Sequence, residues 1–397
     1  MKMNRRDFVL MAGAAALTPL ASTLGCGGDA SPPGSESAAG AGAPAGDTTV
    51  MGMSWAGYDD TIVIDALAGP IQFNIPQQSL PLTDEALAHV RRSGITAVNL
   101  TVSGGATETS GAFENTLARI GAWNDEIEAH PEVFALVRSV TDIRHAKSTG
   151  RLGIVLGFQD AVPFERDLAH LDDFHAAGVR IIQLTYNVQN RIGSGSLVPD
   201  DAGLTELGRE AVARLDELGI LVDLSHCGPR TTLDGIRAST RPVSITHSGC
   251  NAVFRHPRSK EDEALRAMAE RGGVIGIYLM PFLNPSGPPT ADDVLAHIGH
   301  AFDVCGEDHV GIGSDQGIVP LDVSGDFNER FEQVSARRSA LGIAAPREDT
   351  IPYVPDLNHA RRLETIASMM EARGHSSAVI EKVIGGNFLR LFGDVWA

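Results

Sequence analysis

The stretch Leu218-Gly-Ile-Leu-Val-Asp-Leu-Ser-His226 shows the pattern that decides the fold, because an apolar run ends in a polar cluster. A helical stretch precedes it, Leu204–Leu218, whose apolar residues recur at three- and four-residue steps. The next apolar run, Pro242–Thr246, also ends in a histidine, His247. Continuous apolar runs of this kind are typical of parallel strands that are buried on both faces. The stretch therefore predicts a strand–helix unit that can repeat along the chain.

The same unit recurs on both sides of this stretch, from residue 58 onward. We expect eight strands, at Ile62–Asp65, Ile95–Thr101, Gly153–Phe158, Ile181–Tyr186, Ile220–Ser225, Pro242–Thr246, Val274–Leu279 and His309–Ser314. Eight strand–helix units in a span of about 250 residues suit a (β/α)8 TIM barrel. A doubly wound sheet fits the alternation too, but no glycine-rich phosphate fingerprint follows the first strand. The sequence therefore predicts one α/β barrel domain over residues 58–395.

The composition of the 397 residues excludes several classes of protein. A hydrophobic fraction of 43% is enough for a large buried core. The net charge of −18 leaves no basic excess to neutralise nucleic acid or to bind an anionic membrane surface. Four cysteines in so long a chain do not make a disulfide scaffold. We therefore expect a small-molecule partner and no nucleic acid, with the oligomeric state open.

The first 48 residues are expected to form an export signal followed by a flexible linker. Arg5 and Arg6 precede the uncharged stretch Phe8–Leu24, which is short for a membrane span and fits the apolar part of a signal peptide. The twin arginines resemble a Tat export signal, with an ordinary signal peptide as the alternative. Cys26 closes a stretch that resembles a lipoprotein processing site, with cleavage elsewhere as the alternative. Residues 1–26 are therefore expected to export the protein to the periplasm or cell envelope, and the only expected membrane contact is a lipid anchor at Cys26.

Residues 27–48 are expected to form a disordered linker. They consist mainly of glycine, alanine, serine and proline, and such a segment cannot bury apolar surface.

Polar residues follow the expected strands at their carboxyl ends, which meet on one face of a barrel. His226 and His247 follow two consecutive strands, and neutral imidazoles so placed suit Zn²⁺ or a similar ion. Two histidines satisfied within the core are the alternative. Asp315 follows the last strand, where a carboxylate can bind a metal or take a proton from water, or can simply cap the turn. The spacing thus favours a metal-dependent site.

Several linked stretches in one order match a known family. They are Gly178–Asn187, Gly203–Glu210, Leu218–His226, Pro242–Ser248, Arg271–Val274, Asp308–Asp315 and Gly386–Arg390. On these motifs the chain resembles the membrane (renal) dipeptidase family of amidohydrolase-like barrels, over residues 58–393. The resemblance implies a (β/α)8 barrel with a two-metal centre and a dipeptide substrate.

The resemblance also implies roles for single residues. His226 and His247 match the two histidine ligands that follow strands 5 and 6. Asp315 matches the aspartate that acts on the attacking water. Arg258 matches an arginine that holds the substrate carboxylate, a task that suits its bidentate fork.

Four departures from the family pattern alter the expected metal content. Leu67 and Gly69 stand where the family has a histidine and an aspartate ligand, and Gln159 stands in place of the bridging glutamate. Tyr186 replaces a histidine that contacts substrate. Together these changes remove one cation and the carboxylates that balance it. We therefore expect one zinc ion rather than two, with Gln159 and Tyr186 in contact with substrate. A space-filling Tyr186 is the alternative.

Two functions follow from this site. The first is an exported, one-metal hydrolase that cleaves a dipeptide or similar small amide. The alternative is a metal-free or non-hydrolytic homologue that binds or modifies an exported small metabolite. The long segment Gln316–Asn358, with a charged helix over Asn328–Arg338, is expected to close over the substrate, or else to elaborate the surface.

Overall fold

The computed structural model describes residues 53–104, 108 and 110–396. The expected signal peptide, linker and Cys26 anchor therefore lie outside the described residues. Within the described part of the chain, no helix is both long and apolar enough to cross a membrane.

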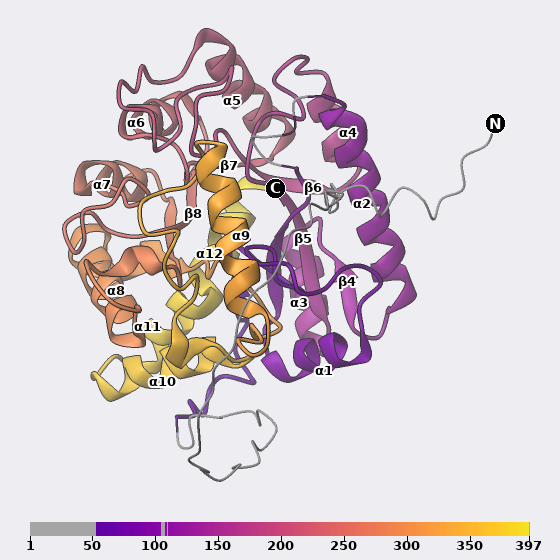
Figure 1. The fold of residues 1–397 in the computed structure, drawn as a ribbon, viewed down its shortest axis with the longest axis vertical. Helices are drawn as coiled ribbons and strands as arrows, with labels where there is room; N and C mark the ends of the chain where they lie inside the picture. The colour runs from indigo at the N-terminus through magenta and orange to yellow at the C-terminus, as the bar shows by residue number, and fades with distance from the viewer. Residues whose placement is uncertain (1–52, 105–107, 109, 397) are drawn as a thin grey trace, which may run out of the picture. The chain divides into compact units, whose positions relative to one another are not determined.

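Eight parallel strands form the barrel at the centre of Figure 1, with helices around them. In barrel order they are β1 (Ile64–Asp65), β3 (Ala97–Thr101), β5 (Leu152–Phe158), β6 (Val179–Gln183), β7 (Leu221–Asp223), β8 (Ser244–Ser248), β9 (Val274–Ile277) and β10 (Val310–Ile312). The first and last strands meet where Ala66 N donates to Ile312 O over 2.9 Å. The side chain of Asp65 adds to this closure by accepting from Ser314 N over 2.7 Å. The expected (β/α)8 barrel is confirmed, and each expected strand is present within a few residues.

Three short strands were not expected from the sequence. Strand β4 (Phe134–Leu136) pairs with the start of β5, on the side that β6 occupies further along. Strands β2 (Ala68–Gly69) and β11 (Gln316–Gly317) form a separate parallel pair beyond the ends of β1 and β10. Strands of two or three residues have no periodicity to detect, because the neighbouring chain alone determines their pairing.

Helices surround the strands on most sides of the barrel. They are α1 (Asp84–Ser93), α2 (Ala112–Ala129), α3 (Val140–Ser148), α4 (His170–Ala176), α5 (Glu206–Leu218), α6 (Pro229–Ala238), α7 (Asp262–Ala269), α8 (Ala291–Cys305), α9 (Phe327–Ala340), α10 (Arg362–Ala372), α11 (Ser377–Glu381) and α12 (Asn387–Val395). Short 3₁₀ turns lie at η2 (Pro281–Leu283), η3 (Glu307–His309) and η4 (Pro355–Leu357), and a π turn at η5 (Lys382–Gly386).

Helix α5 illustrates how capping residues and apolar spacing in the sequence determine where a helix begins, ends and packs. The Thr205 side chain accepts from Gly208 N at its start, and Gly219 ends it with a φ of 67°. Its buried face carries Ala211, Val212 and Leu215, at the spacing that a helix requires to face the sheet.

The interior of the barrel is apolar toward the amino ends of the strands and polar toward their carboxyl ends. Ile64, Ala97, Val155, Ile181, Leu221 and Val274 share one buried cluster. Side chains two residues further along each strand point inward as well, and these include Asn99, Gln183 and Asp223. The polar upper half of the barrel therefore places hydrogen-bonding groups directly below the strand ends.

Candidate active site

The two histidines expected from the sequence lie against each other. His226 follows β7 and His247 lies in β8, and their Nε2 atoms are 2.9 Å apart. Both are buried, with exposed fractions of 4% and 0%. Neighbouring strands of the barrel therefore bring the pair together as expected.

The tautomer of His226 follows from its partner Asn187. The Nδ1 of His226 lies 2.7 Å from Asn187 Oδ1. The amide of Asn187 is oriented by its own Nδ2, which donates to Ile343 O over 2.8 Å. The amide oxygen must accept, so His226 Nδ1 carries the proton and His226 Nε2 presents a lone pair.

The tautomer of His247 follows from Thr246 in the same way. The Thr246 hydroxyl donates to the carboxylate of Asp223 over 2.7 Å. It has one hydrogen, and its neighbour Ser225 Oγ, 3.1 Å away, uses its own on Asp223. Thr246 must therefore accept at the 2.9 Å approach of His247 Nδ1. His247 Nδ1 is therefore protonated, and its Nε2 presents a second lone pair toward His226.

Two lone pairs that face each other at this distance suit a positive centre between or beside them. Protonated Nδ1 atoms with fixed partners are the arrangement that orients metal-binding imidazoles. His226 and His247 thus fit one metal ion as two of its ligands. Within the described ranges, no three His, Cys, Asp or Glu side chains gather closely enough to hold an ion, so water would complete the ligand set.

Burial and two cations keep both imidazoles neutral. Burial, followed by the charges of Arg258 and Lys260, holds the pKa of His226 and of His247 well below the usual value. Arg258 Nη1 donates to Ser225 O over 2.5 Å, directly before His226 in the chain. The neutral form is the one in which an imidazole can bind a metal.

Lys260 is a site residue that the sequence did not reveal. Its Nζ donates to Leu224 O and Cys227 O, both at 2.7 Å, and to Thr232 Oγ1 at 3.0 Å. Burial lowers the pKa of Lys260 to about 8. The ammonium thereby fixes the turn that carries His226. The sequence shows only a lysine in a charged loop, which does not indicate that its ammonium is buried beside His226.

Asp315 lies at the turn after β10. Its φ of 58° is left-handed, a conformation that aspartate tolerates better than most residues. Its backbone N donates to Leu67 O over 2.8 Å, and its backbone O accepts from Asn74 Nδ2 over 2.5 Å. Burial raises the pKa of its carboxyl to about 7, with Arg258 acting in the opposite direction. Among the described residues, none donates a hydrogen bond to this carboxylate, so it is available to a proton.

Tyr186 is in contact with the histidine pair. Its ring stacks on His226 with 4.2 Å between ring centroids. Its hydroxyl accepts from Arg338 Nη2 over 3.1 Å and keeps its own hydrogen for another acceptor. Arg338 also pairs with both carboxylate oxygens of Glu348, at 2.7 and 3.1 Å.

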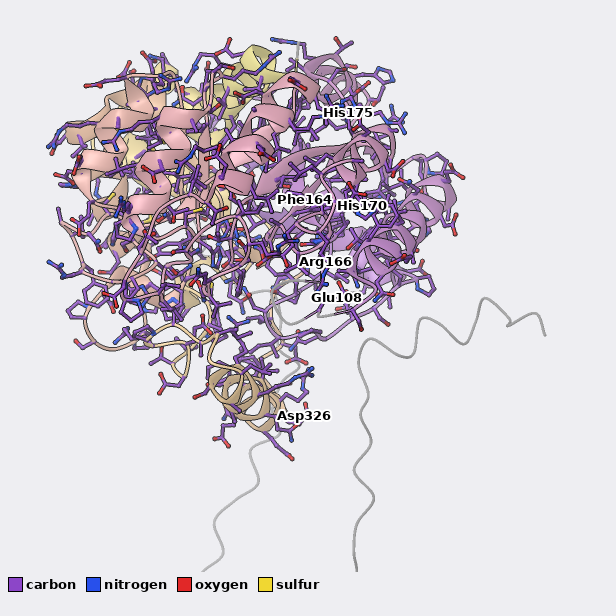
Figure 2. All side chains as sticks on the ribbon, turned by 90° about the horizontal axis from the view of Figure 1, so that it is seen from above. Glu108, Phe164, Arg166, His170, His175 and Asp326 are labelled. Carbon is purple, nitrogen blue, oxygen red and sulfur yellow. The ribbon has the colours of Figure 1, made fainter. Side chains whose placement is uncertain are left out.

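The segment 316–358 contacts residues near the strand ends, and its expected closure over the substrate stays a prediction. Arg338 of α9 reaches Tyr186, and the carbonyl of Ile343 accepts from Asn187. The carbonyl of Pro346 lies 2.8 Å from His256 Nε2. Helix α9 itself protrudes from the molecule, with Asp326 at its start (Figure 2). We name residues 316–358 the cap segment.

Gln159 directly follows β5, which ends at Phe158. Its carbonyl accepts from Gln183 Nε2, and its half-buried side chain makes no hydrogen bond to a described residue. The neighbouring Asp160 accepts from Tyr186 N over 3.0 Å and from Val162 N over 2.8 Å. Asp160 therefore orders the loop that carries Tyr186. The substrate contact expected of Gln159 stays a prediction.

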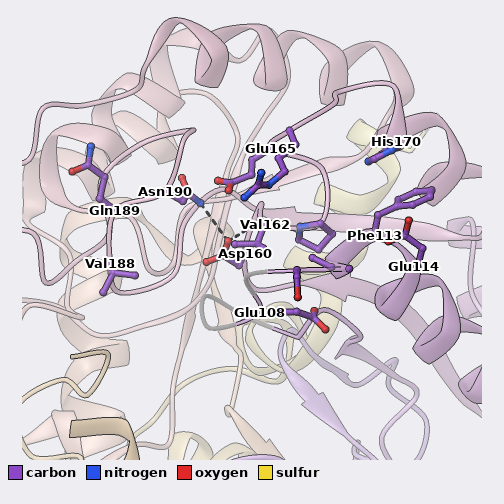
Figure 3. Close-up of a pocket in the computed structure, with 15 residues that line it drawn as sticks. Glu108, Phe113, Glu114, Asp160, Val162, Glu165, His170, Val188, Gln189 and Asn190 are labelled. Atoms are coloured by element: carbon purple, nitrogen blue, oxygen red, sulfur yellow. Dashed lines mark hydrogen bonds between the residues drawn. The ribbon is translucent and has the colours of Figure 1, made fainter. Parts of the chain in front are cut away.

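Two cavities are lined by neighbours of the site residues. One of about 470 Å³ is lined by Asp160, Arg166, His170 and Asn190, among others (Figure 3). The other, of about 290 Å³, has Cys227, His256 and Lys260 in its wall. The first adjoins Tyr186 through the carboxylate of Asp160, and the second adjoins His226 through its neighbour Cys227.

The chain is similar to known proteins in sequence and in fold. The family model for membrane dipeptidase (peptidase family M19) matches residues 60–335. An uncharacterized dipeptidase of Schizosaccharomyces pombe is 32% identical over 254 residues, which cover 62% of this chain and 54% of that protein. Dipeptidase verJ of Clonostachys rogersoniana is 28% identical over 254 residues, covering 63% and 65%. This chain thus spans less than two thirds of either dipeptidase.

A solved structure extends the match to most of the chain. It is that of an amidohydrolase from Pseudomonas aeruginosa, which is 33% identical with a TM-score of 0.72 and covers 85% of this chain and 98% of that one. The family match spans well over half of the 397 residues and includes His226, His247, Arg258 and Asp315. The chain therefore belongs to the membrane dipeptidase family of hydrolases, peptidase family M19.

Proposed function

We propose that this protein is a dipeptidase-like hydrolase that cleaves the amide bond of a dipeptide or similar small amide. The observation that carries the proposal is the pair of facing Nε2 lone pairs on His226 and His247, each oriented through its Nδ1. The carboxylate of Asp315, with a pKa of about 7, supplies a base on the same face of the barrel.

His226 and His247 would hold one zinc ion. When bound, the ion would act as a Lewis acid toward the scissile carbonyl and toward water. The neutral imidazoles and their fixed tautomers support this assignment.

The other residues would bind the substrate and move its proton. Asp315 would take a proton from the attacking water and later return it to the leaving amine. Tyr186 would donate its free hydroxyl hydrogen to the oxygen of the scissile carbonyl. Arg258 has five N–H donors and uses two of them on backbone carbonyls, so further donors remain for a substrate carboxylate.

A metal-free homologue that binds or modifies a small metabolite is the second candidate. It is favoured by the ligand set, because within the described part of the chain no third His, Cys, Asp or Glu joins the pair. The nearby charges of Arg258 and Lys260 also oppose a divalent cation.

We further propose that the protein acts outside the cytoplasm. The twin arginines Arg5 and Arg6 support Tat export, and Cys26 supports a lipid anchor in the cell envelope.

Metal analysis and a peptide panel test the proposal together. The full chain, exported by its own signal, is expected to contain about one zinc per chain. It is expected to hydrolyse members of a panel of L,L-, L,D- and D,L-dipeptides, and to lose this activity with a chelator and in His226→Ala. A zinc-saturated protein that hydrolyses no member of the panel would contradict the proposal. Equal hydrolysis by metal-free protein would contradict the role of the ion.

A further inference from the structure

Two buried amide side chains on the inner wall of the barrel have fixed orientations. Asn99 Nδ2 donates to Ala66 O over 2.9 Å. Gln183 Nε2 donates to Gln159 O and to Thr185 O. Both nitrogens face backbone carbonyls, so the oxygen of each amide must point to the other side, where it can only accept.

These two amide oxygens and one hydroxyl lack partners among the described residues. Asn99 Oδ1, Gln183 Oε1 and Thr101 Oγ1 are all buried, and none has a hydrogen bond to a residue that the structure describes. Asn99 is 4% exposed and Gln183 is 0% exposed. A buried acceptor without a donor costs free energy, so three on one wall indicate a ligand that donates hydrogen bonds.

The three oxygens lie around one short stretch of β5. Thr101 is the register partner of Gly157, and Asn99 Oδ1 lies 2.2 Å from the place where a Cβ on Gly157 would be. Gln183 reaches the same strand two residues later, through the carbonyl of Gln159. Thr101 and Gln159 are half-buried, so this wall is connected to the mouth of the barrel. We name Asn99, Thr101 and Gln183 the acceptor wall.

Two members of the acceptor wall, Asn99 and Thr101, lie across the barrel from the arginine of the site. They belong to β3, which is four strands away from β8 in the eight-strand order, and Arg258 donates to the carbonyl of His247 in β8. Gln183 lies at the end of β6, which is between β3 and β8 in that order. One side of the mouth therefore offers a guanidinium and the other offers neutral oxygens. A molecule with a carboxylate at one end and a protonated amine at the other matches this polarity.

We propose that the acceptor wall binds the free ammonium group of the substrate. The proposal rests on the proposed function and adds the direction in which the dipeptide lies. An ammonium has three N–H donors, and Asn99, Thr101 and Gln183 offer three unused acceptors. The substrate ammonium would thereby place a positive charge on the side of the barrel where Leu67, Gly69 and Gln159 stand in place of metal ligands.

A pair of matched substrates and one isosteric variant test this. Ala-Ala carries the ammonium, and propionyl-alanine has the same shape without it. In the wild type, KM for Ala-Ala is expected to be lower than KM for propionyl-alanine. Thr101→Val removes an unpaired hydroxyl, so it is expected to raise KM for Ala-Ala about tenfold or more and to leave KM for propionyl-alanine unchanged. Its melting temperature without ligand is expected not to fall, which excludes misfolding.

Thr61→Val is the control, because its hydroxyl bonds to Gly57 O before β1 begins. It is expected to change neither KM. Equal wild-type KM values for the two substrates, or an equal effect of Thr101→Val on both, would overturn the acceptor wall while leaving the hydrolase intact. A third outcome is that KCl raises the melting temperature of the wild type more than choline chloride does, and that Thr101→Val removes this difference. That result would mean that the acceptor wall binds an inorganic cation, and it would overturn the ammonium proposal too. A wild type that hydrolyses neither substrate would overturn the proposed function itself.

Discussion

At the scale of single residues, the site depends on the atoms behind the imidazoles. Asn187 fixes the proton on His226, and Thr246 with Asp223 fixes the proton on His247. The sequence predicted the two histidines because each follows an apolar strand. It did not predict their partners' roles, because a threonine or asparagine at a strand end has many possible uses.

Replacing Asn187 with leucine should weaken metal binding. The change removes the acceptor for His226 Nδ1, so the imidazole can turn and shift its proton. Loss of such a partner typically costs 10- to 100-fold in metal affinity. Competition with a chromogenic chelator measures it. Asn124→Leu, in α2, is the control and should bind zinc as the wild type does. An affinity unchanged in Asn187→Leu would contradict the ligand role of His226.

Replacing Asp315 with asparagine should lower activity strongly and stabilise the fold at pH 8. Wild-type kcat/KM should rise as pH increases through about 7, where this carboxyl loses its proton. Arg258 and Arg338 lower its pKa, while burial, Glu348 and Asp65 raise it. Asparagine keeps the left-handed backbone and cannot accept the proton, so kcat should fall by about 10²–10⁴-fold.

The stability change in Asp315→Asn has a defined sign. Because the folded-state pKa is raised, the folded protein keeps a proton between about pH 4 and 7 that the unfolded chain releases. Wild-type stability should therefore fall as pH rises through this range. At pH 8 the variant should be more stable by roughly 1–3 kcal/mol in urea unfolding. A variant less stable than the wild type at pH 8 would contradict the burial of this charge.

At the scale of elements, the sequence predicted the strands that have long apolar runs, but it did not predict pairings that form only in the folded chain. The eight barrel strands and α9 were expected because each has its own pattern of apolar or charged residues. The pair β2–β11 has no such pattern, because it exists only after residues 68 and 316 are brought together. The cap segment was expected from its length, but Arg338 gave no sign that it would reach Tyr186.

Replacing Arg338 with methionine should loosen the cap segment. Tyr186 would lose its donor, and the carboxylate of Glu348 would lose its partner. KM should rise about 3- to 10-fold with a smaller change in kcat, because the loss is mainly in holding the substrate. Steady-state kinetics measures both. Arg337→Met, an exposed neighbour in α9, should leave KM unchanged. If both variants behave alike, the cap segment does not act through Arg338.

At the scale of the whole molecule, the barrel closes through one buried carboxylate. Asp65 is 0% exposed and accepts from the backbone N and the side chain of Ser314. Arg362, also buried, lies 3.9 Å from the same carboxylate. The sequence predicted the barrel from the repeated strand–helix units. It gave no sign of Arg362, which comes from α10.

Replacing Asp65 with alanine should destabilise the barrel strongly. The change leaves two donors of Ser314 unpaired and Arg362 as a buried charge without its partner, and such losses cost about 3–5 kcal/mol. Urea unfolding followed by circular dichroism measures the loss. Asp59→Ala, at an exposed ion pair with Arg361, should cost less than about 1 kcal/mol. Similar losses in the two variants would show that closure does not depend on Asp65.

The bonds between Asp65 and Ser314 join residues 249 positions apart, and those between Asn187 and Ile343 join residues 156 apart. During synthesis β1 can pair early with β3, but its side that faces β10 stays open until most of the polypeptide has left the ribosome. A product truncated before residue 314 would keep an open edge with unpaired backbone groups, a known route to aggregation. Cells making such fragments should degrade them rather than accumulate a partly working enzyme.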